Sequence, residues 1–208
     1  MKTLANGWNV GGMVMFGSAS DEPFAALRDM TFTTAGFMNV PARNRRDAWN
    51  FSLFYSPTSQ LPFPIPGVAY VWRPSSEFEA TIGLPPSIRY RPTDRFTLSA
   101  SCMPLTNFRV CAEQQLADDW AVYASYQAYN ETYFLADRTE DDQRFYVFDQ
   151  RTSIGLKRKI CNGFMLDFSA AYLFDRQLFQ GFNFSQDRED VLKFDPGMGL
   201  TLQLIWAR

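Results

Sequence analysis

The sequence contains no histidine and only three cysteines, and each shortage argues against a class of site. Histidine is the usual proton shuttle of catalysis near neutral pH. Cys102, Cys111 and Cys161 lack the CxxC spacing of zinc ligands, and no histidine can complete a set of four. Two acidic stretches, Asp137–Asp142 and Ser185–Asp190, lack EF-hand spacing, so solvated loop charge explains them better than Ca²⁺. We therefore expect no catalytic residues, no metal and no cofactor.

Long apolar runs and an excess of one charge are missing as well. Hydrophobic residues make up 46% of the 208 residues, yet no run reaches the roughly 18 residues that a membrane-spanning helix needs. This excludes a helical membrane protein. The formal net charge is -2 and the basic residues are scattered, so nucleic acid is not an expected partner. No change in composition divides the chain, which predicts one domain over residues 1–208.

Aromatic residues are plentiful, with 20 Phe, 9 Tyr and 5 Trp, and they lie in short segments where apolar and polar residues alternate. A period of two is the pattern of β-strands. It is clearest near the end of the chain, where Leu192, Phe194, Met198, Leu200, Leu202, Leu204 and Trp206 alternate with Lys193, Asp195, Gly197, Gly199, Thr201 and Gln203. Such runs predict about twelve strands, near residues 8–16, 30–40, 49–55, 68–72, 78–84, 88–90, 96–100, 108–110, 120–126, 146–156, 164–174 and 192–206.

The connections between these runs alternate in length. Bacterial outer-membrane barrels have an even number of strands, short periplasmic turns and longer outer loops. With both termini periplasmic, the inner connections are short: Pro41–Asp47, Arg73–Ser76, Pro92–Arg95, Leu116–Asp119 and Arg158–Gly163. The outer ones include four long segments, Ser18–Arg28, Ser56–Gly67, Leu135–Arg144 and Leu178–Asp190, and two tight exceptions, Leu84–Ser87 and Met103–Thr106. The pattern predicts a single antiparallel up-and-down transmembrane β-barrel of about 12 strands.

The tryptophans provide a second test of this assignment of strands and connections. All five fall at the periplasmic ends of predicted strands and on the outward parity: Trp8, Trp49, Trp72, Trp120 and Trp206. Tryptophan prefers the interface between membrane and water. We therefore predict that these residues form an aromatic belt at one membrane interface.

Charged residues fall on the opposite parity and are predicted to line a lumen: Glu77, Glu79, Arg89, Arg91, Arg109, Glu113, Asp149, Arg151, Asp167, Lys193 and Asp195. Rings of charge can set the ion preference of an aqueous pore. Neighbouring charges of opposite sign can also neutralise each other across a hairpin, as the pair Glu77 and Glu79 would with the pair Arg89 and Arg91. We expect mutual neutralisation to dominate and selectivity to be weak.

Two stretches, Tyr90–Ser101 and Leu116–Ala124, resemble hairpin turns of outer-membrane barrel proteins. Over about Pro66–Arg208 the chain resembles an uncharacterised family of bacterial barrels. The resemblance implies a location in the bacterial outer membrane, with the lipid bilayer as partner, and implies no reaction. The start, Met1–Trp8, turns polar at once, so we expect a mature domain without its signal peptide.

The leading hypothesis is a passive, porin-like channel for ions or small solutes, or a structural envelope component. The alternative is a soluble antiparallel β-barrel or sandwich that turns its aromatic faces inward around an apolar ligand. An envelope enzyme is a third class, but no nucleophile and base can be assembled from these residues.

Overall fold

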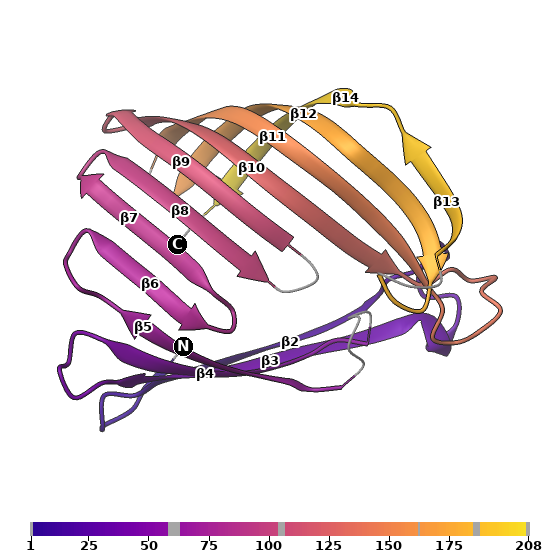
Figure 1. Cartoon of the computed structure of the whole chain (residues 1–208), viewed down its shortest axis with the longest axis horizontal. Helices are drawn as coiled ribbons and strands as arrows, with labels where there is room; N and C mark the ends of the chain where they lie inside the picture. Colours follow the sequence, from indigo (N-terminus) through magenta and orange to yellow (C-terminus); the bar gives the residue numbers. More distant parts are fainter. Residues whose placement is uncertain (1, 58–62, 104–106, 162, 185–187, 207–208) are drawn as a thin grey trace.

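The structure is a computed structural model that describes residues 2–57, 63–103, 107–161, 163–184 and 188–206 (Figure 1). They form one antiparallel sheet in which the strands follow chain order from β1 to β13, and β14 pairs with β12. The predicted all-β, up-and-down arrangement is confirmed. The strands are β1 (Lys2–Thr3), β2 (Asn9–Ser18), β3 (Met30–Pro41), β4 (Ala48–Tyr55), β5 (Ile65–Trp72), β6 (Phe78–Gly83), β7 (Ser87–Thr93), β8 (Phe96–Met103), β9 (Asn107–Ala117), β10 (Trp120–Tyr133), β11 (Arg144–Cys161), β12 (Phe164–Gly181), β13 (Glu189–Phe194) and β14 (Gly197–Trp206).

The fourteen strands form twelve strand rows across the sheet. Strand β1 has two residues and lies beside the start of β2, while β13 and β14 lie end to end along β12. Leaving out β1 and counting β13 with β14 gives twelve, close to the prediction. The sequence predicts one unbroken strand over residues 192–206, but it is interrupted between Phe194 and Gly197. Pro196 lies in the gap, and proline has no N–H to donate to a ladder.

The two ends of the sheet differ in their connections. At the turn end, five connections join the strands in six residues or fewer: 42–47, 73–77, 94–95, 118–119 and 162–163. At the loop end, the connections are 19–29, 56–64, 84–86, 104–106, 134–143 and 182–188. Residues 58–62, 104–106 and 185–187 of the predicted outer loops lie outside the described residues. The 3₁₀ helix η1 (Leu27–Asp29) is the only helix in the described part, which contains none long and apolar enough to cross a membrane.

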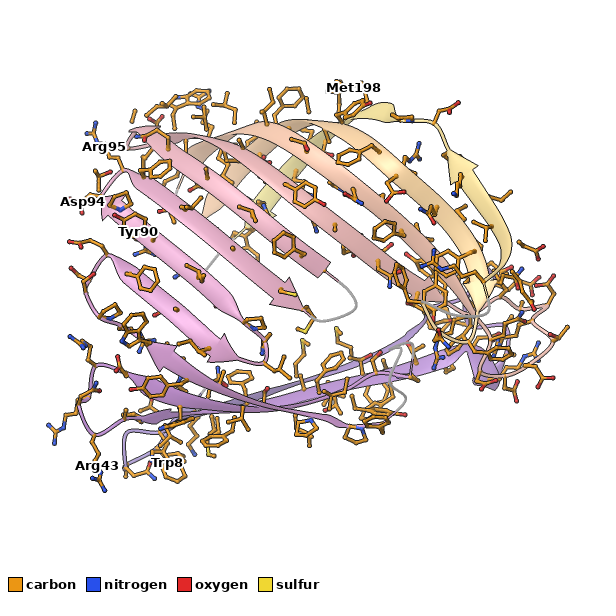
Figure 2. All side chains as sticks on the ribbon, in the orientation of Figure 1. Trp8, Arg43, Tyr90, Asp94, Arg95 and Met198 are labelled. Atoms are coloured by element: carbon orange, nitrogen blue, oxygen red, sulfur yellow. The ribbon has the colours of Figure 1, made fainter. Side chains whose placement is uncertain are left out.

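The sheet is strongly curved, with β2–β5 forming one wall and β6–β12 arching over it (Figure 1). Met198 stands on the convex side (Figure 2). Cross-strand partners share a face, so this outer face can be followed from Met198 to Tyr172, Tyr126 and Ile88. The alternate residues form the concave inner face. One edge of the sheet is formed by β1 and the rest of β2, and the other by β13 and β14. No ladder of the described residues joins the two edges, so the predicted closed barrel is here an open, curved sheet.

Asp47 fixes the longest turn at the turn end, residues 42–47. Its buried carboxylate accepts hydrogen bonds from the Asn44 side chain at 2.7 Å, the Tyr70 hydroxyl at 2.8 Å and the Arg73 backbone N–H at 2.8 Å. The Arg73 hydrogen bond, followed by that from Asn44, holds the pKa of Asp47 below its ordinary value of 3.8. The ionised carboxylate thus joins the β3–β4 turn to the end of β5.

We predict that Asp47→Asn destabilises the folded protein near neutral pH. The pKa in the folded state lies below the unfolded value of 3.8, so the contribution of the carboxylate is fully present above that pH and is lost as pH falls through the folded pKa. Urea unfolding should therefore separate wild type from Asp47→Asn at about pH 7 and bring them together in strong acid. Asp94→Asn, in the exposed β7–β8 turn, serves as the control and should match wild type; an Asp47 variant with wild-type stability at neutral pH would contradict this role.

Candidate functional site

The outer face of the sheet is apolar and exposed. On β14, Leu200, Leu202 and Trp206 are 74%, 68% and 64% exposed. The same face continues over the other strands with the exposed side chains of Val14, Phe16, Phe32, Trp49, Phe51, Leu53, Val68, Trp72, Ile82, Ile88, Tyr90, Leu98, Phe108, Ile154, Phe164, Phe168 and Tyr172. Soluble monomers rarely expose a continuous apolar surface of this extent. An apolar face of this extent is a candidate surface for contact with an apolar partner.

The inner face holds eight of the eleven charged residues predicted to line a lumen: Glu79, Arg89, Arg91, Arg109, Glu113, Asp149, Arg151 and Asp167. Glu77 lies in the turn before β6, and Asp195 lies between β13 and β14. Lys193 pairs with Gln177, beyond the irregularity in the β11–β12 ladder, so simple alternation does not reach it. The charges that the structure brings together are therefore those of β6 to β12.

A chain of polar contacts crosses the inner face of β9 to β12. Lys157 donates to Glu113 at 2.5 Å, and its ammonium lies 4.9 Å from the centre of the Tyr123 ring. The Tyr123 hydroxyl donates to Asp167 at 3.0 Å. Opposite Tyr123 on β11 is Gly155, where an added Cβ would come within 2.3 Å of the ring. Glycine is therefore required where the ring crosses β11.

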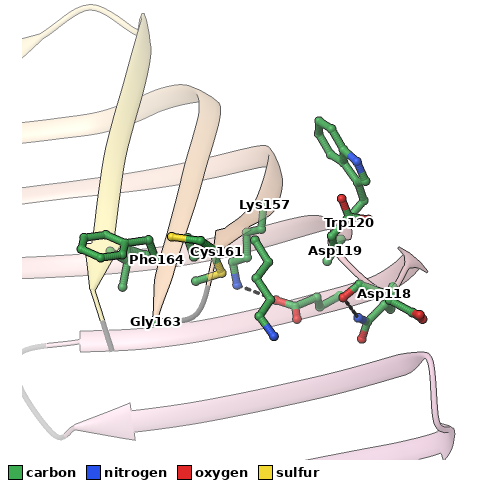
Figure 3. Close-up of a pocket in the computed structure, with 13 residues that line it drawn as sticks. Asp118, Asp119, Trp120, Lys157, Cys161, Gly163 and Phe164 are labelled. Carbon is green, nitrogen blue, oxygen red and sulfur yellow. Dashed lines mark hydrogen bonds and ion pairs between the residues drawn. The ribbon is translucent and has the colours of Figure 1, made fainter. Parts of the chain in front are cut away.

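Glu113 and Lys157 of these polar contacts border a cavity of about 370 Å³ at the turn end (Figure 3). Lys157 points into it beside Cys161, while Asp118 and Asp119 lie at the β9–β10 turn. Met165 and Ile205 supply apolar wall. The cavity therefore combines an ion pair, an acidic turn and an apolar wall. In the part of the chain that the structure describes, no group of three or more potential metal ligands gathers.

A second inner cluster lies nearer the loop end. Arg151 donates to both oxygens of Asp149, at 2.8 and 2.7 Å, and its guanidinium lies 5.4 Å from the centre of the Tyr129 ring. The hydroxyls of Tyr129 and Tyr133 both donate to Glu131. Both acids thus have hydrogen-bond donors, but only Asp149 is paired with a cation.

Glu79 makes its ion pair with Arg73 of the preceding turn, at 2.6 Å. The sequence suggested that Glu77 and Glu79 would neutralise Arg89 and Arg91 across the hairpin, and in the structure Arg89 is the direct cross-strand partner of Glu79. Arg73 competes successfully because its backbone N–H is already held by Asp47, which places its guanidinium beside the start of β6. Arg89 has no carboxylate within ion-pair distance among the described residues.

The five tryptophans all lie at the turn end. Trp49 begins β4, Trp72 ends β5 and Trp206 ends β14, each exposed on the outer face. Trp8 immediately precedes β2, and Trp120 begins β10 beneath the guanidinium of Arg158, 4.9 Å from its ring. Their rings thus gather at one end of the sheet.

The loop end is held together by contacts between distant connections. The Phe134 N–H donates to the Ala19 carbonyl at 2.7 Å, and the Ala136 N–H donates to Asp21 at 2.8 Å. Beside them, Arg138 and Asp29 form an ion pair of 2.6 Å in which both side chains are 1% exposed. These contacts join the β2–β3 and β10–β11 connections, which lie eight strands apart in the sheet order.

Two further loop-end segments join the same assembly. Arg144 donates to the carbonyls of Phe182, at 3.1 Å, and Pro57, at 3.4 Å. Next to it, Tyr146 stacks on Phe179 with ring centres 4.9 Å apart, and both side chains are fully buried. We call the contacts of residues 19–29, 57, 134–144 and 182 the loop-end cluster.

Sequence reasoning placed the acids and arginines on one face but missed their neutral partners. Tyr123, Tyr129 and Tyr133 were not among the predicted lumen residues, although their odd numbers put them on the same parity of β10 as the charges. The signal was present in the spacing of these tyrosines. No pattern in the sequence indicated the pairing of Asp29 with Arg138, which are 109 residues apart.

We predict that Asp29→Asn weakens the loop-end cluster strongly. Removing one partner of a buried ion pair leaves the other charge uncompensated, which costs about 3–5 kcal/mol. Asp141→Asn is the matched control, because its ion pair with Arg28 is 3.8 Å long and its side chain is 85% exposed, so its loss should cost at most about 1 kcal/mol. Limited proteolysis of residues 134–143 measures the difference, and equal protection of both variants would refute the assignment.

Comparison with known proteins yields no matching family model, no matching curated protein and no matching solved structure. The function has to be argued from the chain itself. Two features are available for that argument: an apolar outer face that crosses the whole sheet, and an inner face where charges and tyrosines gather.

Proposed function

We propose that this chain is a bacterial outer-membrane β-barrel protein that acts as a passive, porin-like channel or as a structural component of the envelope, without enzymatic activity. The observation that carries the proposal is the continuous apolar outer face. A membrane barrel needs an apolar band toward lipid and tolerates charge toward the lumen. The tryptophans at the turn end and the long connections at the loop end support the same orientation.

The alternative, a soluble barrel or sandwich around an apolar ligand, has less support. It would turn most large aromatic side chains toward the inside. Instead, the most exposed aromatic side chains of the strands, such as Phe16 and Trp206, lie on the outer face. On β2, β3 and β8 the exposed large apolar side chains of the inner face are Met13, Met15, Phe37 and Met103.

The function is tested first by refolding the protein into lipid vesicles and, separately, into plain buffer. The proposal expects a β-rich, heat-modifiable species that forms only with lipid, and conductance steps when the vesicles fuse with a planar bilayer. A protein that inserts but passes no current would leave the structural role. A monodisperse β-rich protein in plain buffer would overturn the membrane assignment.

We predict that two adjacent residues of β14 respond oppositely to arginine. Leu202 lies on the outer face and Thr201 on the inner face, opposite Ser169. Leu202→Arg should oppose insertion by about 2–4 kcal/mol because the charge would face the bilayer interior, whereas Thr201→Arg would face water. The measurement is the fraction of heat-modifiable protein in vesicles across a urea series. Equal insertion of the two variants would argue against a lipid-facing outer face.

The proposal requires that β2 and β14 pair and close the barrel. The two strands run antiparallel, because neighbouring strands alternate in direction and an even number of strand rows lies between β2 and β14. Starting from Gly12 and moving to the cross-strand partner on each next strand leads to a position on the last row about twelve residues before Leu204. Pairing Gly12 with Leu204 thus gives a stagger of about one residue per strand, which corresponds to a tilt of about 36°.

We predict that cysteines at Val14 and Leu202 form a disulfide in the refolded protein. This register makes them direct partners on the outer face, within the roughly 4.4–6.8 Å between Cα atoms that a disulfide spans. The background replaces the three native cysteines with serine. Val14→Cys with Gln203→Cys is the control, because Gln203 lies on the inner face. A gel shift on reduction reports the bond. A second variant combines Val14→Cys with Leu204→Cys, which tests a register shifted by two residues. Absence of a disulfide from both the Leu202 and the Leu204 combinations would contradict closure.

A further inference from the structure

Three arginines on the inner face lack carboxylate partners. Arg89 and Arg91 on β7 and Arg109 on β9 are all exposed, and none takes part in an ion pair with another described residue. Of the acids nearest to them by register, Glu79 binds Arg73 and Glu113 binds Lys157, while Glu77, level with Arg91, accepts a hydrogen bond from Ser75. Arg89 and Arg109 therefore carry positive charge that no carboxylate of the described residues pairs with.

Hydroxyl groups lie between these arginines. Ser99 is the cross-strand partner of Arg89, and Ser101 is the partner of Arg109. The ladder spacing puts the Cα atoms of Arg89 and Arg109 about 12 Å apart, on either side of these two serines. Long guanidinium side chains on both sides of a pair of hydroxyls form a surface of hydrogen-bond donors. We call Arg89, Arg91, Arg109, Ser99 and Ser101 the basic strip.

The rest of the inner face differs from the basic strip. On β10 to β12 Arg151 neutralises Asp149, whereas Glu131 and Asp167 accept hydrogen bonds from tyrosine hydroxyls, which leave their negative charge in place. The arginines without an ion pair thus lie on β7 and β9, and the acids without an ion pair lie on β10 and β12. An incoming anion therefore meets an excess of positive charge at the basic strip.

We propose that the basic strip binds small anions, oxyanions such as phosphate above all, and makes the lumen anion-selective. The guanidinium group offers paired N–H donors that match the oxygens of phosphate or carboxylate. A cleft lined by one sign of charge between low-dielectric walls also concentrates the counter-ion. The selectivity rests on the proposed channel function, whereas the binding does not.

Binding is tested without any current. The thermal unfolding of the detergent-refolded protein is followed with and without inorganic phosphate at constant ionic strength, since a ligand of the native state raises the unfolding temperature. Phosphate should raise it for wild type and for Arg43→Gln, a variant of an exposed turn arginine (Figure 2). The rise should disappear in the double variant Arg89→Gln with Arg109→Gln. An equal rise in all three proteins would overturn the site.

Selectivity is tested by the reversal potential of single channels in a KCl gradient. Wild type and Arg43→Gln should favour chloride, and the double glutamine variant should lose or invert that preference. The variant Arg89→Lys with Arg109→Lys keeps the charge but lacks the planar fork, so it should retain chloride preference while losing most of its response to phosphate. Cation preference in wild type would refute anion selectivity. Phosphate binding without any conductance would refute the channel and leave the anion site.

Discussion

The structure depends on one constraint: a sheet one layer thick must keep the same alternation of faces across every ladder. Because side chains alternate along a strand, a slip of one residue between two strands would move the apolar set of one strand to the other face. The irregularities in the ladders are near strand ends, at Trp120, at Lys159 and between Tyr90 and Thr93, or at the Phe148–Gln150 step, beyond which β12 extends to the loop end. The central rows remain in step, so one apolar face and one polar face result.

The same constraint decides how the charges are distributed. Every inner-face acid faces other inner-face residues and can be satisfied only by them, by the turns or by water. Tyrosines and the turn arginine Arg73 take that role for Asp167, Glu131 and Glu79. A partly buried carboxylate is costly to leave without donors, whereas an arginine exposed to water is hydrated. The less exposed acids Glu131, Asp149 and Asp167 therefore have protein donors, and the exposed arginines of β7 and β9 face water.

The fold was largely predictable from the sequence, and the pairing of its charges was not. The placement of Leu200, Leu202 and Leu204 on one face follows directly from their spacing of two residues, and the turn residues mark where each strand ends. The parity of Glu79 likewise follows from the sequence, but its partner depends on the Arg73 backbone that Asp47 holds. Nothing in the sequence around Gly155 indicates that glycine is required there, because the requirement comes from the ring of Tyr123, which lies across this residue.

Curvature and the loop-end cluster support each other. The twist of neighbouring strands bends the sheet, but bending alone does not bring the β2–β3 connection to the β10–β11 connection. The buried pair of Asp29 and Arg138 joins them, and it forms only if residues 109 apart meet. Once these connections are joined, the ordering of eight intervening strands has already taken place, so bringing β2 and β14 together costs little additional chain entropy. In the proposed barrel, a contact outside the membrane span would thus favour closure within it.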